Sequence, residues 1–153
     1  MKMEKKAAKK NHWFHKTKIV AVSGYFDPIH IGHIDYLEMA KKLGDKLLVI
    51  VNNDYQANLK KGYSFMCEDE RIKIVKSLRC VDDVVKSIDM DRTIRKTLIK
   101  YQPHIFANGG DRNNKEIPES KICKEYGIEI IDGLGAKVQS SSSLVARFKK
   151  YNG

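Results

Sequence analysis

The chain has 153 residues, of which 42% are hydrophobic and 31% charged, and its formal net charge is +10 at neutral pH. This length suits one domain with a core of its own, without disulfides or a structural metal. Cys67, Cys80 and Cys123 form no C-x-x-C pair, and no apolar run approaches the roughly 20 residues that cross a bilayer, so we expect a cytoplasmic protein with no membrane partner.

The basic charge is concentrated at the N-terminus. The first 18 residues carry seven lysines against Glu4, which is +6 of the total +10 and leaves +4 for the rest. We expect residues 1–16 to form a basic, flexible leader and residues 17–153 to form a single domain. A lysine-rich leader also suits nucleic acid, but a solubilising role explains the charge as well, so nucleic acid is the less favoured partner.

Short apolar runs alternate with longer amphipathic ones along the chain. The apolar runs predict strands, and the segments with helical spacing predict helices. Residues 55–66 are read as a polar, lysine-bearing stretch between two of these elements. The predicted strands are 19–22, 46–51, 81–85, 104–107 and 129–131, and the predicted helices are 34–43, 68–78, 91–101, 118–126 and 141–150.

This alternation predicts the α/β class: a Rossmann-like, doubly wound parallel sheet of five strands with helices on both faces. Ligands of such sheets bind at the carboxyl ends of the strands. Distinctive polar segments follow four of the predicted strands, namely residues 24–33, 52–54, 108–112 and 140–143. Their expected convergence on one rim of the sheet favours an enzyme.

Residues 24–33 read Gly-Tyr-Phe-Asp-Pro-Ile-His-Ile-Gly-His, between a strand and a helix. His30 and His33 lie three residues apart at the mouth of that helix, so both imidazoles can project from one face. A helix N-terminus favours an anion, above all a phosphate, and two imidazoles beside it indicate that the phosphate reacts. The alternatives are two core or surface histidines, or half of a zinc site that lacks suitably spaced partners.

His30-Ile31-Gly32-His33 resembles the H-x-G-H signature of the nucleotidylyltransferase superfamily. The resemblance covers roughly residues 18–147 and is greatest to the cytidylyltransferase-like group, which includes glycerol-3-phosphate cytidylyltransferases and the adenylyltransferase domain of heptose-1-phosphate enzymes. It implies that His30 and His33 bind the α-phosphate and stabilise its five-coordinate transition state. It also implies that four residues of the same segment bind the nucleotide: Gly24, Tyr25, Phe26 and Gly32.

The resemblance extends to two further segments. Lys61-Gly62 matches a flexible-loop Lys-Gly pair whose lysine reaches the triphosphate, while Lys60 is read as a solvated surface lysine. Gly109-Gly110-Asp111 resembles the Gly-Gly-Asp-Tyr of the heptose enzymes, which implies that Asp111 binds the nucleotide. Arg112 replaces the usual aromatic residue, and a guanidinium there would suit a phosphorylated acceptor.

The serine run of residues 140–143 corresponds to the group's I-S-T-T-x-I segment, which implies that Ser140, Ser141 and Ser142 hold the β- and γ-phosphates. The R-T-E-G sequence that usually precedes it is missing, and Lys137 is the candidate to supply the lost positive charge.

Two residues are assigned to the acceptor. Asp54 ends Val51-Asn52-Asn53-Asp54, the counterpart of a V-N-S-D strand end, and would meet a hydroxyl; the alternative is a turn residue. Arg71 would contact phosphate; the alternative is a structural ion pair.

The resemblance therefore implies a nucleotidylyltransferase, with ATP slightly favoured over CTP as the donor. The acceptor would be a sugar or polyol phosphate, and pyrophosphate would be released. Mg²⁺ would be bound mainly through the triphosphate rather than by a protein metal site. A homodimer is expected from the resemblance alone. Two alternatives stay open: a catalytically inactive nucleotide sensor on the same fold, and a nucleic-acid-binding module that uses the leader.

Overall fold

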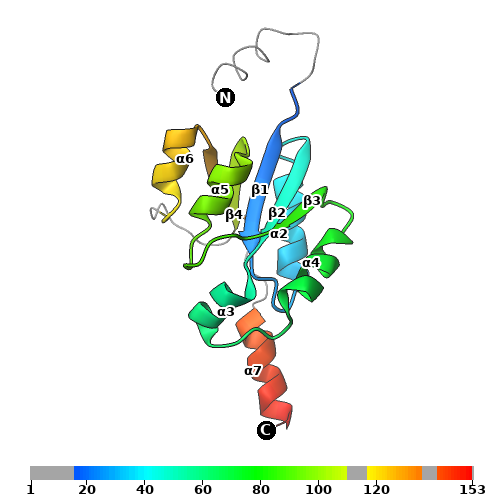
Figure 1. The fold of residues 1–153 in the computed structure, drawn as a ribbon. Helices are drawn as coiled ribbons and strands as arrows, with labels where there is room; N and C mark the ends of the chain where they lie inside the picture. Colours follow the sequence, from blue (N-terminus) through cyan, green and yellow to red (C-terminus); the bar gives the residue numbers. More distant parts are fainter. Residues whose placement is uncertain (1–15, 110–116, 136–140, 153) are drawn as a thin grey trace.

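The computed structural model describes residues 16–109, 117–135 and 141–152. Its centre is a five-stranded sheet in the order β3-β2-β1-β4-β5, in which every pair of neighbours is parallel (Figure 1). The predicted doubly wound α/β fold is confirmed. The strands are β1 Ile19–Gly24, β2 Lys46–Val51, β3 Asp83–Lys86, β4 Ile105–Gly109 and β5 Glu129–Leu134.

Helices cover both faces of this sheet, as predicted. One face packs against α2 and α4, the other against α5 and α6, while α3 and α7 lie beyond the carboxyl ends of the strands (Figure 1). The helices are α2 Ile31–Lys41, α3 Asp54–Lys61, α4 Glu68–Lys76, α5 Arg95–Tyr101, α6 Ser120–Tyr126 and α7 Ser141–Asn152.

The core consists of two apolar layers separated by the sheet. Val20 and Val22 of β1 face Leu37 of α2, whereas Ala21 between them faces Leu98 of α5. β1 and β2 are thus buried on both sides, which explains why their sequences are apolar throughout rather than alternating. This double burial fixes the carboxyl ends of the central strands, and with them the loops that follow.

Residues 54–61 are helical, whereas the sequence predicts only a polar, lysine-bearing stretch over residues 55–66. The helix is set by reciprocal capping: Gln56 N donates to Asn53 Oδ1 at 2.8 Å, and Asn53 N donates to Gln56 Oε1 at 3.0 Å. Gly62, with φ of 83°, ends the helix in the left-handed region. Lys60 and Lys61 therefore occupy the last turn of α3 instead of a flexible loop.

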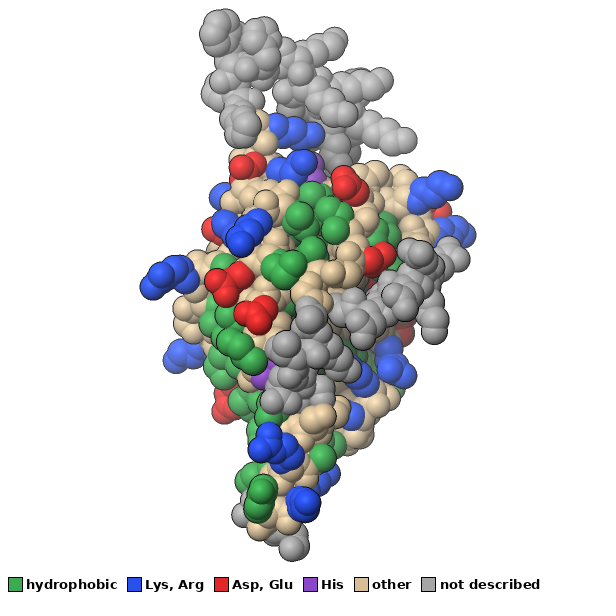
Figure 2. Space-filling model, turned by 180° about the vertical axis from the view of Figure 1, so that it is seen from behind, with side chains coloured by type: hydrophobic (Ala, Val, Ile, Leu, Met, Phe, Trp, Pro, Cys, Tyr) green, Lys and Arg blue, Asp and Glu red, His purple; other side chains and the backbone are tan. Residues whose placement is uncertain are grey.

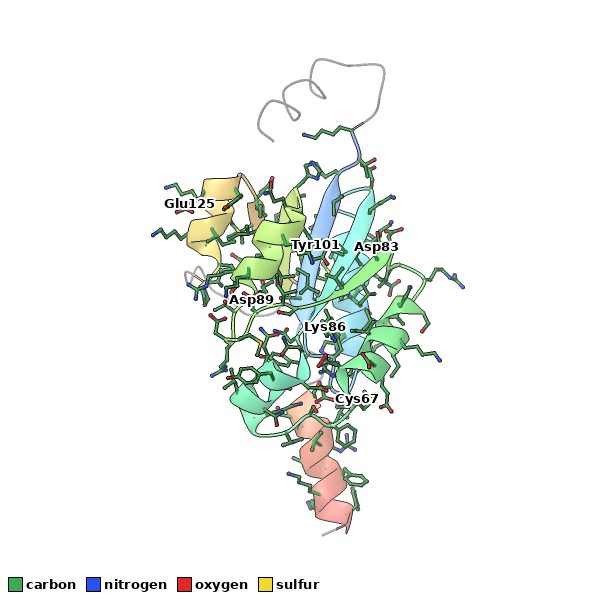
Figure 3. The ribbon with its side chains drawn as sticks, in the orientation of Figure 1. Cys67, Asp83, Lys86, Asp89, Tyr101 and Glu125 are labelled. Carbon is green, nitrogen blue, oxygen red and sulfur yellow. The ribbon has the colours of Figure 1, made fainter. Side chains whose placement is uncertain are left out.

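α5 begins at Arg95, whereas the sequence predicted a helix that begins at residue 91. The carboxylate of Asp89 accepts the backbone N–H groups of Lys96 at 2.8 Å and Thr97 at 3.0 Å. Asp91 instead accepts from Thr93 N at 2.8 Å, a short local turn. Asp89, labelled in Figure 3, thereby anchors a compact connection between β3 and α5.

The last helix extends away from the body of the domain, beyond the carboxyl edge of the sheet (Figure 1). Lysine, arginine and hydrophobic side chains stand together on this projecting helix (Figure 2), among them Arg147, Phe148 and Lys149. Within the described part of the chain, none of the helices has the length and apolar character that a transmembrane segment requires.

Candidate active site

A cavity of about 590 Å³ opens at the carboxyl edge of the sheet, within the size range of sites for small ligands. It lies where the strand order reverses, between β1 and β4. Residues that are far apart in the sequence line it: Ser23–Asp27, His30, Gly32, His33, Tyr36, Asn52, Lys60, Lys61, Arg92, Ile94, Phe106, Asn108, Gly109, Glu119, Leu134, Gly135, Ser141 and Ser142. The predicted convergence of post-strand segments on one rim is present.

His30 and His33 are oriented by the backbone at the start of α2. His30 is the N-cap residue, and its Nδ1 accepts the N–H of Gly32 at 3.1 Å. Three residues later, Nδ1 of His33 accepts the N–H of His30 at 3.2 Å. Because both Nδ1 atoms are acceptors, the proton of each neutral imidazole is on Nε2. Two Nε2–H donors are therefore available to a ligand in the cavity.

The two imidazoles are stacked, with ring centroids 3.8 Å apart and planes inclined by 22°. Burial lowers the pKa of His33 from 6.5 to about 4, and the charges of His30 and Lys60 act in the same direction. Burial also lowers the pKa of His30. Both rings are thus neutral at pH 7, which makes them hydrogen-bond donors and acceptors rather than cations.

Gly24 and Phe26 shape the segment that carries the histidines. The Phe26 ring contacts His33 edge-on, with centroids 4.9 Å apart, and its backbone adopts φ of 52°. A Cβ on Gly24 would stand 3.0 Å from the Phe26 ring, so only glycine leaves room for this packing. Phe26 is 1% exposed, so we expect it to support His33 from within the core rather than to offer a free face to the nucleotide.

The two lysines at the end of α3 both line the cavity, but in different settings. Lys61 forms an ion pair of 2.8 Å with the fully buried carboxylate of Asp27, which also accepts the N–H groups of Phe65 and Met66 at 2.7 Å. Lys60 extends over the ring of Tyr25, with its Nζ 4.4 Å from the centroid. Lys60 is exposed, as expected of the surface lysine that the sequence indicated, and it also borders the cavity.

The N-terminus of α7 faces the same cavity as the histidines, because Ser141 and Ser142 line it. The Oγ of Ser141 donates to the carbonyl of Pro28 at 2.8 Å, which joins α7 to the loop after β1. Unpaired N–H groups at such a helix start favour phosphate. Four predicted site residues lie outside the described residues: Asp111, Arg112, Lys137 and Ser140.

Asp54 and Arg71 are paired with each other, and neither lines the cavity. Arg71 is 0% exposed, and its guanidinium donates to the Asp54 carboxylate at 2.8 Å. It also donates to the backbone carbonyls of Tyr25, Asn52 and Met66 at 2.7–2.9 Å. These contacts agree with the structural ion pair that the sequence left open for Arg71, and they place both residues outside the lining of the cavity.

The far end of the cavity is bounded by β4 and β5. Asn108 donates to the Asp132 carboxylate at 3.2 Å, and Leu134 and Gly135 complete this wall. The sequence did not single out Asn108, Glu119 or Arg92 as site residues, although all three line the cavity. For Asn108 the signal was its place in the polar segment 108–112, whereas Arg92 and Glu119 fell within predicted helices and gave no signal of a site.

Comparison with known proteins agrees with this geometry. Residues 21–144 match the cytidylyltransferase-like family. The chain belongs to the cytidylyltransferase-like family. This membership confirms the resemblance stated for the chain and supports transferase activity of the nucleotidyltransferase type.

Similar proteins add detail to this assignment. The cytidylyltransferase-like chain is 37% identical over 139 residues to the bifunctional protein HldE of Helicobacter pylori strain Shi470, covering 89% of this chain and 28% of that protein. It is 34% identical over 136 residues to the bifunctional protein HldE of Streptomyces coelicolor, covering 84% of this chain and 28% of that protein. The chain thus spans just over a quarter of the length of these curated relatives.

Solved structures share the fold. A lipopolysaccharide core biosynthesis protein from Thermoplasma volcanium GSS1 is 28% identical, with a TM-score of 0.64, and the match covers 78% of this cytidylyltransferase-like chain and 98% of that one. A protein from Archaeoglobus fulgidus, 17% identical with a TM-score of 0.52 over 78% of this chain and 98% of that one, shares the fold alone.

Proposed function

We propose that this chain transfers a nucleotidyl group from an NTP to the phosphate of a sugar or polyol phosphate. An oxygen of the acceptor phosphate forms a new bond to the α-phosphorus in line with the leaving group. The bond from the α-phosphorus to its bridging oxygen breaks, and the electron pair leaves with pyrophosphate. Because no covalent enzyme intermediate is required, catalysis consists of positioning and electrostatic stabilisation.

The observation that carries this proposal is the pair of oriented imidazoles. The backbone contacts of His30 and His33 leave both Nε2–H groups as donors at the mouth of α2. Charge that develops on the equatorial oxygens of the α-phosphate would be stabilised there without reorganisation of the protein. The positive end of the α2 dipole acts in the same direction.

The triphosphate would extend from the histidines to the start of α7. Ser141 and Ser142 line that side of the cavity, and Lys61 is the nearby cation whose partner, Asp27, keeps it at the wall. Within the described ranges there is no group of three His, Cys, Asp or Glu residues that could hold a metal ion. Because Mg²⁺ keeps several waters and prefers phosphate oxygens, it would bind through the triphosphate and neutralise charge there. Ser140 and Lys137 remain proposed members of this site.

We favour ATP slightly over CTP, because the Gly-Gly-Asp segment and the serine run resemble those of ATP-using relatives. The identity to HldE proteins and the fold shared with a lipopolysaccharide core biosynthesis protein support a sugar phosphate as the acceptor. Asp111 at the nucleotide and Arg112 at the acceptor are proposed on the resemblance. A homodimer is proposed on the same ground.

The test is pyrophosphate release in the presence of Mg²⁺, with ATP and CTP assayed separately against a panel of sugar and polyol phosphates. The informative variants are His30→Asn and His33→Asn. An asparagine keeps an acceptor near the position of Nδ1, so the cap of α2 is retained while the Nε2–H donor is lost. We expect kcat to fall on the order of 10²–10³-fold in each variant.

Measuring nucleotide binding by the same proteins distinguishes a wrong role for the histidines from a protein that binds NTP without catalysis. Normal turnover by a correctly folded His33→Asn enzyme would remove the histidine from the mechanism. Binding of NTP without release of its pyrophosphate in the presence of any acceptor on the panel would favour the nucleotide sensor.

A further inference from the structure

Three side chains from different segments meet at one wall of the cavity: Tyr25 after β1, Lys60 at the end of α3, and Arg92 before α5. Burial raises the pKa of the Tyr25 hydroxyl, and the adjacent Arg92 guanidinium acts in the opposite direction, so the two groups face each other. The Nζ of Lys60 lies 4.4 Å from the centroid of the Tyr25 ring. One aromatic side chain therefore holds two cations at the same wall of the site.

The backbone that carries Arg92 is anchored on both sides. Asn53 donates through Nδ2 to the carbonyls of Ser87 and Asp89 at 3.0 Å. Gln56 donates through Nε2 to the carbonyls of Asp91 and Thr93 at 2.8 Å. Asn53 and Gln56 are themselves buried, so α3 and the segment before α5 form one unit. The backbone that carries Arg92 is thus held to α3, which carries Lys60, by buried and half-buried hydrogen bonds.

Arg92 has donors to spare for a ligand. Its neighbour Asp91 forms an ion pair with Arg95 at 3.1 Å, and across the described ranges Arg92 pairs with no carboxylate. A guanidinium carries five N–H donors, more than the Tyr25 hydroxyl beside it can engage. The planar fork that remains fits two oxygens of a phosphate, and a nearby ammonium adds a second positive charge.

Lys60 and Arg92 lie in the same cavity as the histidine pair, close to where the α-phosphate would react. The charge of Lys60 acts on the imidazole of His33, so the ammonium lies within electrostatic reach of the histidine pair. The start of α7 and Lys61 offer a separate set of groups to the triphosphate. An anion between Lys60 and Arg92 would stand beside the α-phosphate, where an attacking phosphate must be placed.

We propose that Lys60 and Arg92 bind the phosphate of the acceptor, with Tyr25 as the positioning residue that holds both cations. The site would then select monophosphate esters over the corresponding free sugars and polyols. This inference rests on the proposed function, and it assigns the acceptor phosphate to residues that the motifs of the chain did not identify.

The direct test is calorimetric titration of inorganic phosphate into the full chain loaded with Mg²⁺ and a non-transferable α,β-methylene analogue of ATP or CTP, whichever binds more tightly. We expect saturable phosphate binding that weakens about tenfold or more in Arg92→Gln and in Lys60→Gln, as expected for the loss of one charge-assisted contact. Tyr25→Phe, which loses the hydroxyl but keeps the ring, should weaken phosphate binding less than either of these two substitutions.

The matched control is Arg95→Gln. Arg95 lies three residues from Arg92, is exposed and does not line the cavity, so its loss should leave phosphate binding within about twofold of wild type. In Arg92→Gln the affinity for the nucleotide analogue should also be retained. The same variant should raise the acceptor KM in the pyrophosphate assay while the KM of the NTP stays constant.

Equal phosphate binding by wild type and Arg92→Gln would overturn the inference, as would an absence of phosphate binding to the loaded wild-type chain. A loss of nucleotide affinity in Arg92→Gln would overturn it as well, because the arginine would then belong to the triphosphate site. Arg92-dependent phosphate binding without transfer to any acceptor would instead retain the anion subsite and reject the proposed function.

Discussion

The three-residue spacing of His30 and His33 serves folding and chemistry together. The two residues occupy the N-cap and third helical positions of α2, and each Nδ1 accepts a backbone N–H from the start of the helix. The arrangement is a reciprocal capping box in which imidazoles replace the usual Ser and Glu. Because capping occupies Nδ1, the donor left for a ligand is Nε2 on both rings.

The lowered pKa of His33 predicts a pH dependence of stability. The folded state holds the ring neutral with a pKa of about 4, whereas an unfolded histidine takes up its proton near 6.5. The unfolded chain therefore binds more protons between these values, and the free energy of unfolding should fall as pH decreases from about 6.5 to about 4. Urea unfolding at pH 7.5 and pH 4.5 measures this loss.

The His33→Asn variant is the control for that measurement, because it lacks the titrating ring and keeps the cap. Its free energy of unfolding should decrease less between the two pH values than that of wild type. Equal decreases would show that other groups cause the acid sensitivity.

The buried guanidinium of Arg71 makes a second residue-scale prediction. Replacement by methionine would leave the Asp54 carboxylate and three backbone carbonyls without their donor, which should cost about 3 kcal/mol or more of unfolding free energy. Arg95→Met, at an ion pair whose side chains are 47% and 55% exposed, should cost about 0–1 kcal/mol. Denaturant unfolding of both variants measures the two losses. A loss of unfolding free energy below about 1 kcal/mol in Arg71→Met would contradict the structural role of Arg71.

The sequence could not assign residues whose position in the site depends on tertiary packing between distant segments. Lys60 and Lys61 are adjacent in the same helical turn, and only the packing of α3 against the loop after β1 directs one to Tyr25 and the other to Asp27. Arg92 had no motif around it, and its place in the site depends on buried hydrogen bonds from Asn53 and Gln56. His30 and His33, in contrast, were predictable because motif and helix start coincide.

At the scale of elements, α3 was missed although its start signal was present. Asn53 and Gln56 have the N-cap and N3 spacing of a capping box, but the charged, weakly apolar sequence that follows obscured the helix. The lysines that end α3 are therefore held by a capped helix instead of a loop. Strands buried on both faces, such as β2, were predicted well because a short, continuous apolar run is typical of a strand inside a parallel sheet.

The contact between the loop after α3 and α7 leads to a prediction about nucleotide affinity. The ring centroid of Tyr63 lies 5.3 Å from the Nζ atoms of both Lys61 and Lys149, so Tyr63 joins the lysine of the site to the helix that presents Ser141. Tyr63→Ala should raise the KM of the NTP roughly 2- to 10-fold through the loss of two cation–π contacts, with little change in kcat.

Tyr101→Ala provides the matched control for that variant. Tyr101 has the same 37% exposure as Tyr63 and a cation–π distance of 5.3 Å to Lys100, but Lys100, unlike Lys61, does not line the active-site cavity. Its KM for the NTP should equal that of wild type. Equal effects of the two substitutions would indicate general destabilisation rather than a link between the loop and α7.

At the scale of the whole molecule, the alternation of strands and helices was sufficient to predict the parallel sheet and its layers. Strand order was not predictable, because each crossover is compatible with either side of the preceding strand until the helices pack. The order β3-β2-β1-β4-β5 brings the histidine segment, the end of β4 and the start of α7 around one cavity. The predicted convergence of the site follows from that order.

The central claim is that two neutral, backbone-oriented imidazoles promote nucleotidyl transfer to a phosphorylated acceptor. Its most direct test is pyrophosphate release with Mg²⁺ by wild type and by His33→Asn, each shown to be folded and to bind NTP. The structure predicts release by wild type with at least one sugar or polyol phosphate, and a loss of about 10²–10³-fold in kcat for the variant. Equal turnover by the two proteins would contradict the claim, and so would wild-type protein that neither binds NTP nor releases pyrophosphate.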